Sequence, residues 1–190
     1  MTASVTVARA GCRQRRGRRR ETLPICFALI RSMDGDAAHL HRVMPHHTYL
    51  LVGGGMTSAA AIAGIREVDR RGSIGLIGAE PHPPYDRPPL SKALWQEAPL
   101  DAIWRKADGQ GVSSYAGRTA RTLDPMTRKI VDDQGTAYTY DKLLLATGST
   151  PRRLAFDDAG IIYFRTLDDY QRLRLAIERG KRVAIIGGGF

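Results

Sequence analysis

The chain has 190 residues, a formal net charge of +10 and an apolar content of 43%, which suits one globular domain or one domain and part of a second. No apolar run approaches the roughly 18 residues of a membrane-spanning helix, so the sequence predicts no transmembrane segment. Both cysteines, Cys12 and Cys26, precede the first predicted element. This excludes enzymes whose core carries a redox-active cysteine pair or a catalytic thiol.

The basic charge is concentrated in residues 1–43, which contain nine arginines, no lysine and three acidic residues. We expect this leader to be disordered and dispensable, because it has no packing pattern. Its arginine tract fits a nucleic-acid-binding tail, a mitochondrial presequence, a twin-arginine export signal or translation from an upstream start codon. An upstream start is favoured because Met44 lies just before the first strand. Nucleic-acid binding is disfavoured because no aromatic residues interleave with the arginines.

The first predicted element is a short apolar strand, Tyr49–Val52, which runs into Gly53, Gly54 and Gly55. These glycines permit a turn that is too tight for a Cβ atom. Apolar residues at helical spacing predict a helix over Thr57–Arg70, whose N-terminus points back at the turn. Unpaired N–H groups and the helix dipole favour an anion there, so we expect a dinucleotide pyrophosphate to bind.

The residues that follow agree with a dinucleotide-binding unit. Ser58 stands at the third position of the GxGxxG pattern and is small enough to let the helix approach the strand. The second predicted strand, Ser73–Ala79, ends at Glu80, which is placed to accept hydrogen bonds from a ribose hydroxyl. A glycine turn alone is weak evidence. Together with the strand, the helix and this acid, it favours nucleotide binding over a turn without a ligand.

Beyond Glu80 the chain alternates between loops, short strands and one further helix. Pro84, Pro88 and Pro89 predict a stiff loop without helix. The next predicted elements are a helical piece over Pro99–Lys106, extended segments over Tyr115–Gly117 and Arg118–Asp124, a hairpin of Lys129–Asp132 with Thr136–Tyr140, a buried apolar run at Leu143–Ala146 and a helix over Leu167–Arg179. A final strand over Val183–Ile186 leads into a second glycine turn.

Three segments carry a more specific pattern than the glycine turns: PYDRPPLSK at 84–92, TYDKLLLATGSTPR at 139–152 and YFRTLDD at 163–169. With the terminal VAIIGGGF, they make the chain from Thr48 to Phe190 resemble the flavoprotein reductases of ferredoxin, rubredoxin and putidaredoxin. These belong, with apoptosis-inducing factor, to the FAD-dependent pyridine nucleotide-disulfide oxidoreductases. The resemblance implies FAD at the first glycine turn and NAD(P)H at the second.

The resemblance also gives roles to residues outside the turns. It implies that Arg87 contacts the phosphate and ribitol region of FAD, and that Lys92 lies near the flavin ring, where a cation stabilises reduced flavin. It implies that the turn at Thr147 and Gly148 closes over the cofactor. The predicted cofactor-binding residues are Gly53, Gly54, Gly55, Thr57, Ser58, Glu80, Arg87, Lys92, Ala120 (through its backbone, to adenine), Thr147, Gly148, Arg165 (to the flavin), Gly187 and Gly189. No catalytic acid or base and no metal site is predicted.

The expected fold is an α/β, FAD/NAD(P)-binding three-layer (Rossmann-like) parallel sheet with a small antiparallel β insertion, truncated at the start of a second nucleotide-binding domain. We expect the leader at 1–43 and the N-terminal part of an FAD-binding domain at 44–160. A linker helix and the first strand of an incomplete NAD(P)-binding domain are expected at 161–190.

The expected function is that of a cytoplasmic FAD-dependent NAD(P)H oxidoreductase. It would pass electrons through the flavin to a ferredoxin-like protein or a quinone-like small acceptor, without a membrane or nucleic-acid partner. One alternative is a non-catalytic fragment of such an enzyme, because the second turn stops at Phe190; residues 1–190 alone are then expected to be inactive with NAD(P)H. A further alternative is a basic nucleic-acid-binding module that acts through the arginine tract.

Overall fold

The structure, a computed structural model, describes residues 44–105, 111–155 and 160–187. The predicted leader at 1–43 and the predicted site residue Gly189 lie outside these residues. The described chain begins with a β-α-β unit, composed of β1 (His46–Val52), α1 (Met56–Val68) and β2 (Ile74–Gly78). This confirms the predicted strand, helix and strand. β1 begins three residues before the apolar run that predicted it.

An apolar layer between the sheet and α1 holds the β-α-β unit together. β1 and β2 are parallel neighbours. Ile62 of α1 is fully buried against Leu51 of β1 and against Ile74 and Leu76 of β2. Each such side chain contributes about 1.5–3 kcal/mol when it leaves water. This burial fixes α1 against one face of the sheet, with its N-terminus at the end of β1.

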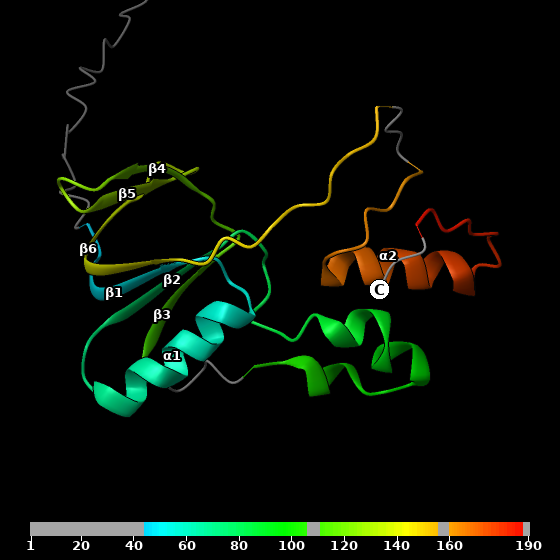
Figure 1. The fold of residues 1–190 in the computed structure, drawn as a ribbon, viewed down its shortest axis with the longest axis horizontal. Coiled ribbons are helices and arrows are strands. Elements are labelled where there is room, and N and C mark those ends of the chain that lie inside the picture. Colours follow the sequence, from blue (N-terminus) through cyan, green and yellow to red (C-terminus); the bar gives the residue numbers. More distant parts are fainter. Residues whose placement is uncertain (1–43, 106–110, 156–159, 188–190) are drawn as a thin grey trace, which may run out of the picture. The chain divides into compact units, whose positions relative to one another are not determined.

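Four more strands complete a six-stranded sheet (Figure 1). They are β3 (Val112–Ala116), β4 (Ala120–Asp124), β5 (Lys129–Asp132) and β6 (Ala137–Leu145). The order is β3-β2-β1-β6-β5-β4. β3, β2, β1 and β6 are parallel, whereas β5 is antiparallel to both of its neighbours. The predicted α/β class, a mainly parallel sheet with a small antiparallel part, is therefore confirmed.

β6 changes partners along its length. Its first half lies between β1 and β5, with Thr139 opposite both His46 and Lys129. Its second half pairs with β1 alone among the described strands. Leu143–Ala146 was predicted to be buried, but the segment is only partly buried, and Leu145 is 58% exposed.

A second apolar core lies among three short 3-10 helices and α2. These helices are η1 (Pro88–Ser91), η2 (Ala93–Gln96), η3 (Leu100–Ile103) and α2 (Leu167–Glu178). Buried Tyr85, Leu90 and Leu94 pack there against Leu167 and Tyr170 of α2. The prediction of a non-helical proline loop is wrong at η1. Its prolines occupy the first helical positions, where the absent N–H is not needed and the fixed φ suits the turn.

The end of the described chain differs from the prediction. α2 ends as expected before Gly180, which has a φ of +71°. Val183–Ile186, however, does not form the predicted strand. No strand of the described chain pairs with it, and Ile185 and Ile186 are 88% and 80% exposed. An extended segment becomes a strand only when a neighbour takes up its backbone hydrogen bonds. Among the described residues, no helix has the length and apolarity needed to cross a membrane.

His47 is buried within the sheet, although it precedes the predicted strand. Its side chain is 5% exposed, and its Nε2 lies 2.9 Å from the hydroxyl of Tyr115. Gly75 on β2 leaves room for the imidazole ring, because a Cβ at that position would overlap it. Burial, with the charge of His46 as a smaller cause, lowers the pKa of His47 below its usual 6.5.

We expect the free energy of unfolding to fall as the pH is lowered below 6.5. The pKa of His47 is lower in the folded chain than in the unfolded chain, so protonation favours unfolding. The stabilisation is present above the unfolded pKa and is lost as the pH falls through the folded pKa. Urea denaturation between about pH 7.5 and pH 5 measures this slope. His47→Phe should flatten it and His46→Gln should retain most of it; equal slopes in the wild type and His47→Phe would contradict the assignment.

Candidate functional site

A pocket of about 890 Å³ opens where β1, β2 and β6 end. The carboxyl ends of parallel strands are the usual ligand site of such sheets, and small-molecule pockets typically measure about 300–1,000 Å³. The pocket is lined by residues 53–57, 79–80 and 146–151, and by Arg87, Arg153, Ile161, Tyr163, Arg165, Thr166, Asp169 and Arg172. It therefore combines the glycine turn with residues that come from just before and within α2.

The three glycines of the turn differ in what surrounds them. Gly53 has a φ of +118°, and a Cβ there would overlap the carbonyl oxygen of Ala146. A Cβ on Gly54 would lie 3.4 Å from the Cα of Gly78. A Cβ on Gly55 would have no atom within 4 Å. The fold itself thus requires Gly53 and brings Gly54 into contact with β2, whereas Gly55 faces the open pocket, as an approaching ligand requires.

The N-terminus of α1 adds hydrogen-bond donors to this turn. Gly55 is the N-cap, no side chain caps the helix and no acidic residue lies in its first turn. The first N–H groups of an α-helix lack partners within the helix and carry a partial positive charge. Thr57 lines the pocket beside them. The arrangement fits the pyrophosphate of a dinucleotide.

Glu80, at the end of β2, belongs to a polar network. Its carboxylate accepts a hydrogen bond from the hydroxyl of Tyr85 at 2.5 Å and pairs with Arg87. Arg87 also donates to the carbonyl of Arg165 at 2.9 Å. The hydroxyl of Tyr85 in turn accepts from the backbone N–H of Leu167 at 2.9 Å. Burial, and next the hydrogen bond to Glu80, raises the pKa of Tyr85 to about 12, so it stays protonated at neutral pH.

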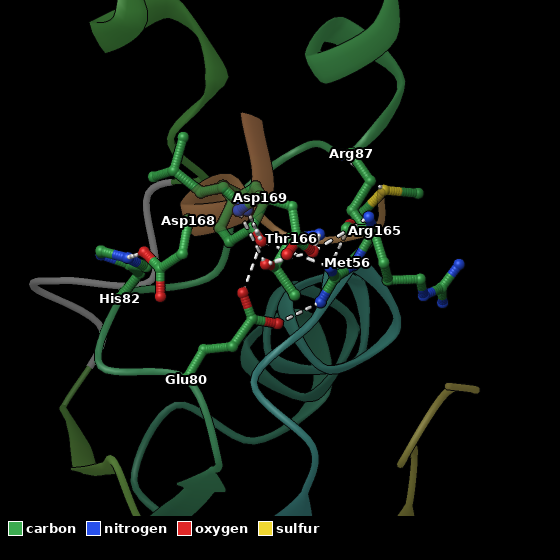
Figure 2. A network of polar contacts seen from close by, with 10 residues as sticks. Met56, Glu80, His82, Arg87, Arg165, Thr166, Asp168 and Asp169 are labelled. Carbon is green, nitrogen blue, oxygen red and sulfur yellow. Dashed lines mark hydrogen bonds and ion pairs between the residues drawn. The ribbon is translucent and has the colours of Figure 1, made fainter. Parts of the chain in front are cut away.

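This network connects the end of β2 to the start of α2 (Figure 2). Thr166 and Asp169 cap α2 reciprocally, each side chain accepting a backbone N–H from the other residue. His82 adds a second link, because its Nε2 lies 2.7 Å from Asp168. The wall of the pocket that precedes α2 is consequently held by several polar contacts.

The pocket carries more positive than negative charge. Four arginines and two acids line it. Arg87 is paired with Glu80, and Arg153 lies over the ring of Tyr163 at 5.3 Å. The guanidinium groups of Arg165 and Arg172 make no hydrogen bond or ion pair with another described residue. A net positive pocket favours an anionic ligand.

The pocket brings together most of the residues predicted from the sequence. Those that line it are Gly53, Gly54, Gly55, Thr57, Glu80, Arg87, Thr147, Gly148 and Arg165. The other described ones are Ser58, which is buried in α1 behind the turn, exposed Lys92, half-buried Ala120 on β4 and exposed Gly187. None of these four lines the pocket, and their cofactor contacts stay predictions.

Sequence reasoning missed Tyr85, Arg153 and Arg172. Tyr85 lies inside the PYDRPPLSK segment, between Glu80 and Arg87, which were both predicted to bind the cofactor. This position in the sequence could have indicated that Tyr85 contacts them. Arg172 occupies an ordinary helix position, and nothing in the sequence distinguishes it. Within the described part of the chain, no cluster of His, Cys, Asp and Glu is suited to a metal ion.

The chain is similar in sequence to known oxidoreductases. The sequence model of the pyridine nucleotide-disulphide oxidoreductases matches residues 47–190. The ferredoxin–NAD(+) reductase component of the p-cumate 2,3-dioxygenase system of Pseudomonas putida is 38% identical over 147 residues, covering 74% of this chain and 37% of that protein. Mitochondrial apoptosis-inducing factor 1 of Dictyostelium discoideum is 31% identical over 169 residues, covering 75% and 31%.

A solved structure shows the same fold. The crystal structure of the covalent putidaredoxin reductase–putidaredoxin complex matches with a TM-score of 0.62 and 26% identity, over 69% of this chain and 34% of that chain. The chain thus spans well under half of the length of the relatives that it matches.

We expect Gly53→Ala to destabilise the fold and Gly55→Ala to leave it unchanged. At Gly53 the new Cβ would overlap Ala146, and the φ of +118° disfavours any L side chain. Such overpacking costs about 1–3 kcal/mol and left-handed backbone about 1–2 kcal/mol more. At Gly55 the φ is −101° and the Cβ meets nothing. Thermal unfolding tests the difference, and equal melting temperatures for the two variants would show that the close approach is not required.

Proposed function

The chain belongs to the pyridine nucleotide-disulphide oxidoreductase family, and we propose that it forms the FAD-binding part of an NAD(P)H oxidoreductase. The complete enzyme would pass electrons from NAD(P)H through the flavin to a ferredoxin-like protein or a small acceptor. The observation that carries the proposal is the open approach to Gly55 beside the uncapped N-terminus of α1. There the backbone can contact a pyrophosphate without hindrance.

Different residues of the pocket would bind different parts of FAD. Gly55 and the first N–H groups of α1 would bind the pyrophosphate, and Glu80 would accept hydrogen bonds from a ribose hydroxyl. Arg87 orients Glu80, and Arg165, whose guanidinium reaches Gly148, supplies a positive charge near the turn that follows β6. When bound, FAD can accept a hydride and release its electrons one at a time. The chain binds and orients the cofactor and adjusts the charge around it.

The second glycine turn supports NAD(P)H as the co-substrate. Gly187 has a φ of +116°, and its counterpart Gly53 in the first turn has a φ of +118°. The same left-handed backbone follows an apolar segment in both cases. We propose that Gly187 and Gly189 begin the NAD(P)H site.

An electron-transfer protein is the proposed acceptor. Several relatives are, by their names, ferredoxin–NAD(+) reductase components of dioxygenase systems, including those for p-cumate and for biphenyl. The putidaredoxin reductase structure holds its reductase together with putidaredoxin. A ferredoxin-like acceptor is therefore preferred over a small quinone-like molecule.

We expect Gly55→Val to abolish FAD binding without unfolding the chain. The new side chain would enter the open space that the pyrophosphate needs. Gly64→Val is the matched control, because Gly64 also has no atom within 4 Å of a Cβ but lies on α1 away from the pocket. Flavin fluorescence during titration with FAD measures the affinity. The site assignment fails if the two variants bind FAD equally.

Glu80→Ala should weaken FAD by about 1–3 kcal/mol, the usual contribution of a hydrogen bond to a charged group. The same titration measures this loss, and circular dichroism checks that the fold is retained. An unchanged affinity would remove the ribose role from Glu80.

A further inference from the structure

Tyr85 carries a hydroxyl whose hydrogen-bonding capacity is fully used. It accepts from the backbone N–H of Leu167 at 2.9 Å and from Nη1 of Arg87 at 3.2 Å. A tyrosine hydroxyl has a single proton to donate and two acceptor lone pairs. Its proton is therefore directed at the remaining neighbour, Oε2 of Glu80, at 2.5 Å. The two donors fix the direction of this hydrogen bond.

Core packing accounts for the ring of Tyr85 but not for its hydroxyl. The side chain is 2% exposed and packs in one apolar cluster with Leu90 and Leu167. A phenylalanine would fill the same space without the cost of desolvating a hydroxyl. The hydroxyl instead joins the acid that follows β2 to the first residue of α2.

We propose that Tyr85 is a positioning residue for ribose recognition: its hydroxyl holds the Glu80 carboxylate in the orientation that accepts ribose hydroxyls and ties it to the N-terminus of α2. The inference rests on the proposed function, because it takes the adenosine half of FAD as the ligand at Glu80. Each carboxylate oxygen has two acceptor positions. Tyr85 and Arg87 use one position on each oxygen. The remaining positions are left for the ribose, and they point in fixed directions only while both partners hold the carboxylate.

The test compares ADP with 2′,3′-dideoxy-ADP, which has the same pyrophosphate but no ribose hydroxyls, by calorimetric titration of the chain. In the wild type we expect ADP to bind about tenfold more tightly than dideoxy-ADP, because hydrogen bonds to a charged group contribute a free energy of that size. In Tyr85→Phe we expect this preference to fall to about threefold or less, while the affinity for dideoxy-ADP is unchanged. A role limited to packing would not change the ratio.

Tyr138→Phe is the matched control. Tyr138 is also buried, and its hydroxyl donates to a carboxylate, Asp132, at 2.8 Å, but neither residue lines the pocket. This variant should keep the wild-type preference. A wild-type chain that binds neither nucleotide, or both equally, overturns the nucleotide site and this inference together. A wild-type preference that Tyr85→Phe retains overturns the positioning role alone and leaves the proposed function intact.

A measurement on the wild type covers the case in which Tyr85→Phe does not fold. The N–H of Leu167 donates to the hydroxyl of Tyr85, which donates to Glu80. A ribose that binds to Glu80 should therefore change the environment of the Leu167 N–H through that hydroxyl. In NMR titrations we expect ADP to shift the Leu167 amide resonance clearly more than dideoxy-ADP does. Equal shifts from the two nucleotides would overturn the proposal.

Discussion

The close approach of three strand ends is the constraint on which the described structure depends. Gly53, which follows β1, has the carbonyl of Ala146 directly against its backbone, and Gly54 lies against Gly78 of β2. A side chain on Gly53 would overlap Ala146, whereas a Cβ on Gly54 would only touch Gly78, so Gly53 is the position at which the chain must leave β1 without a side chain. The pocket results from this packing. Of the three glycines in the turn, Gly55 is the one with open space at its Cβ position, and it is the one that a ligand can approach.

The opposite wall of the pocket depends on polar contacts. The 3-10 helices and α2 share their own apolar core, and Glu80, Tyr85 and Arg87 connect that core to the end of β2. Such networks stabilise a structure only when every member is satisfied. The same carboxylate lines the pocket, so one acidic group contributes both to the charge of the site and to the contacts that hold the N-terminus of α2.

Local rules predicted the elements whose partners lie nearby in sequence. The strand, glycine turn, helix and strand around Gly53–Gly55 follow from periodicity, and the hairpin between β5 and β6 follows from its turn residues. Burial of Leu143–Ala146 was predicted from its apolarity, and a strand at Val183–Ile186 from its apolarity, the glycines that follow it and the family resemblance. Both properties depend on neighbouring strands. Among the described residues, the second half of β6 has β1 on one side and no strand on the other, and no strand lies beside Val183–Ile186. The burial of His47 could not be predicted either, because it depends on the absence of a side chain at Gly75, on the neighbouring strand.

The structure contains two similar tyrosine–carboxylate pairs, Tyr85 with Glu80 and Tyr138 with Asp132. They differ in their position in the fold more than in their local chemistry, and the position decides which carboxylate can bind a ligand. Burial and a carboxylate partner raise the pKa of both Tyr85 and Tyr138 to about 12. Asp132, the partner of Tyr138, is fully buried and also accepts from Arg118 and from the backbone N–H groups of Gln134 and Thr136. Four donors satisfy it and close the β5–β6 turn. Glu80 has two donors, its side chain is 27% exposed and it lines the pocket. Its remaining acceptor capacity is what a ribose can use.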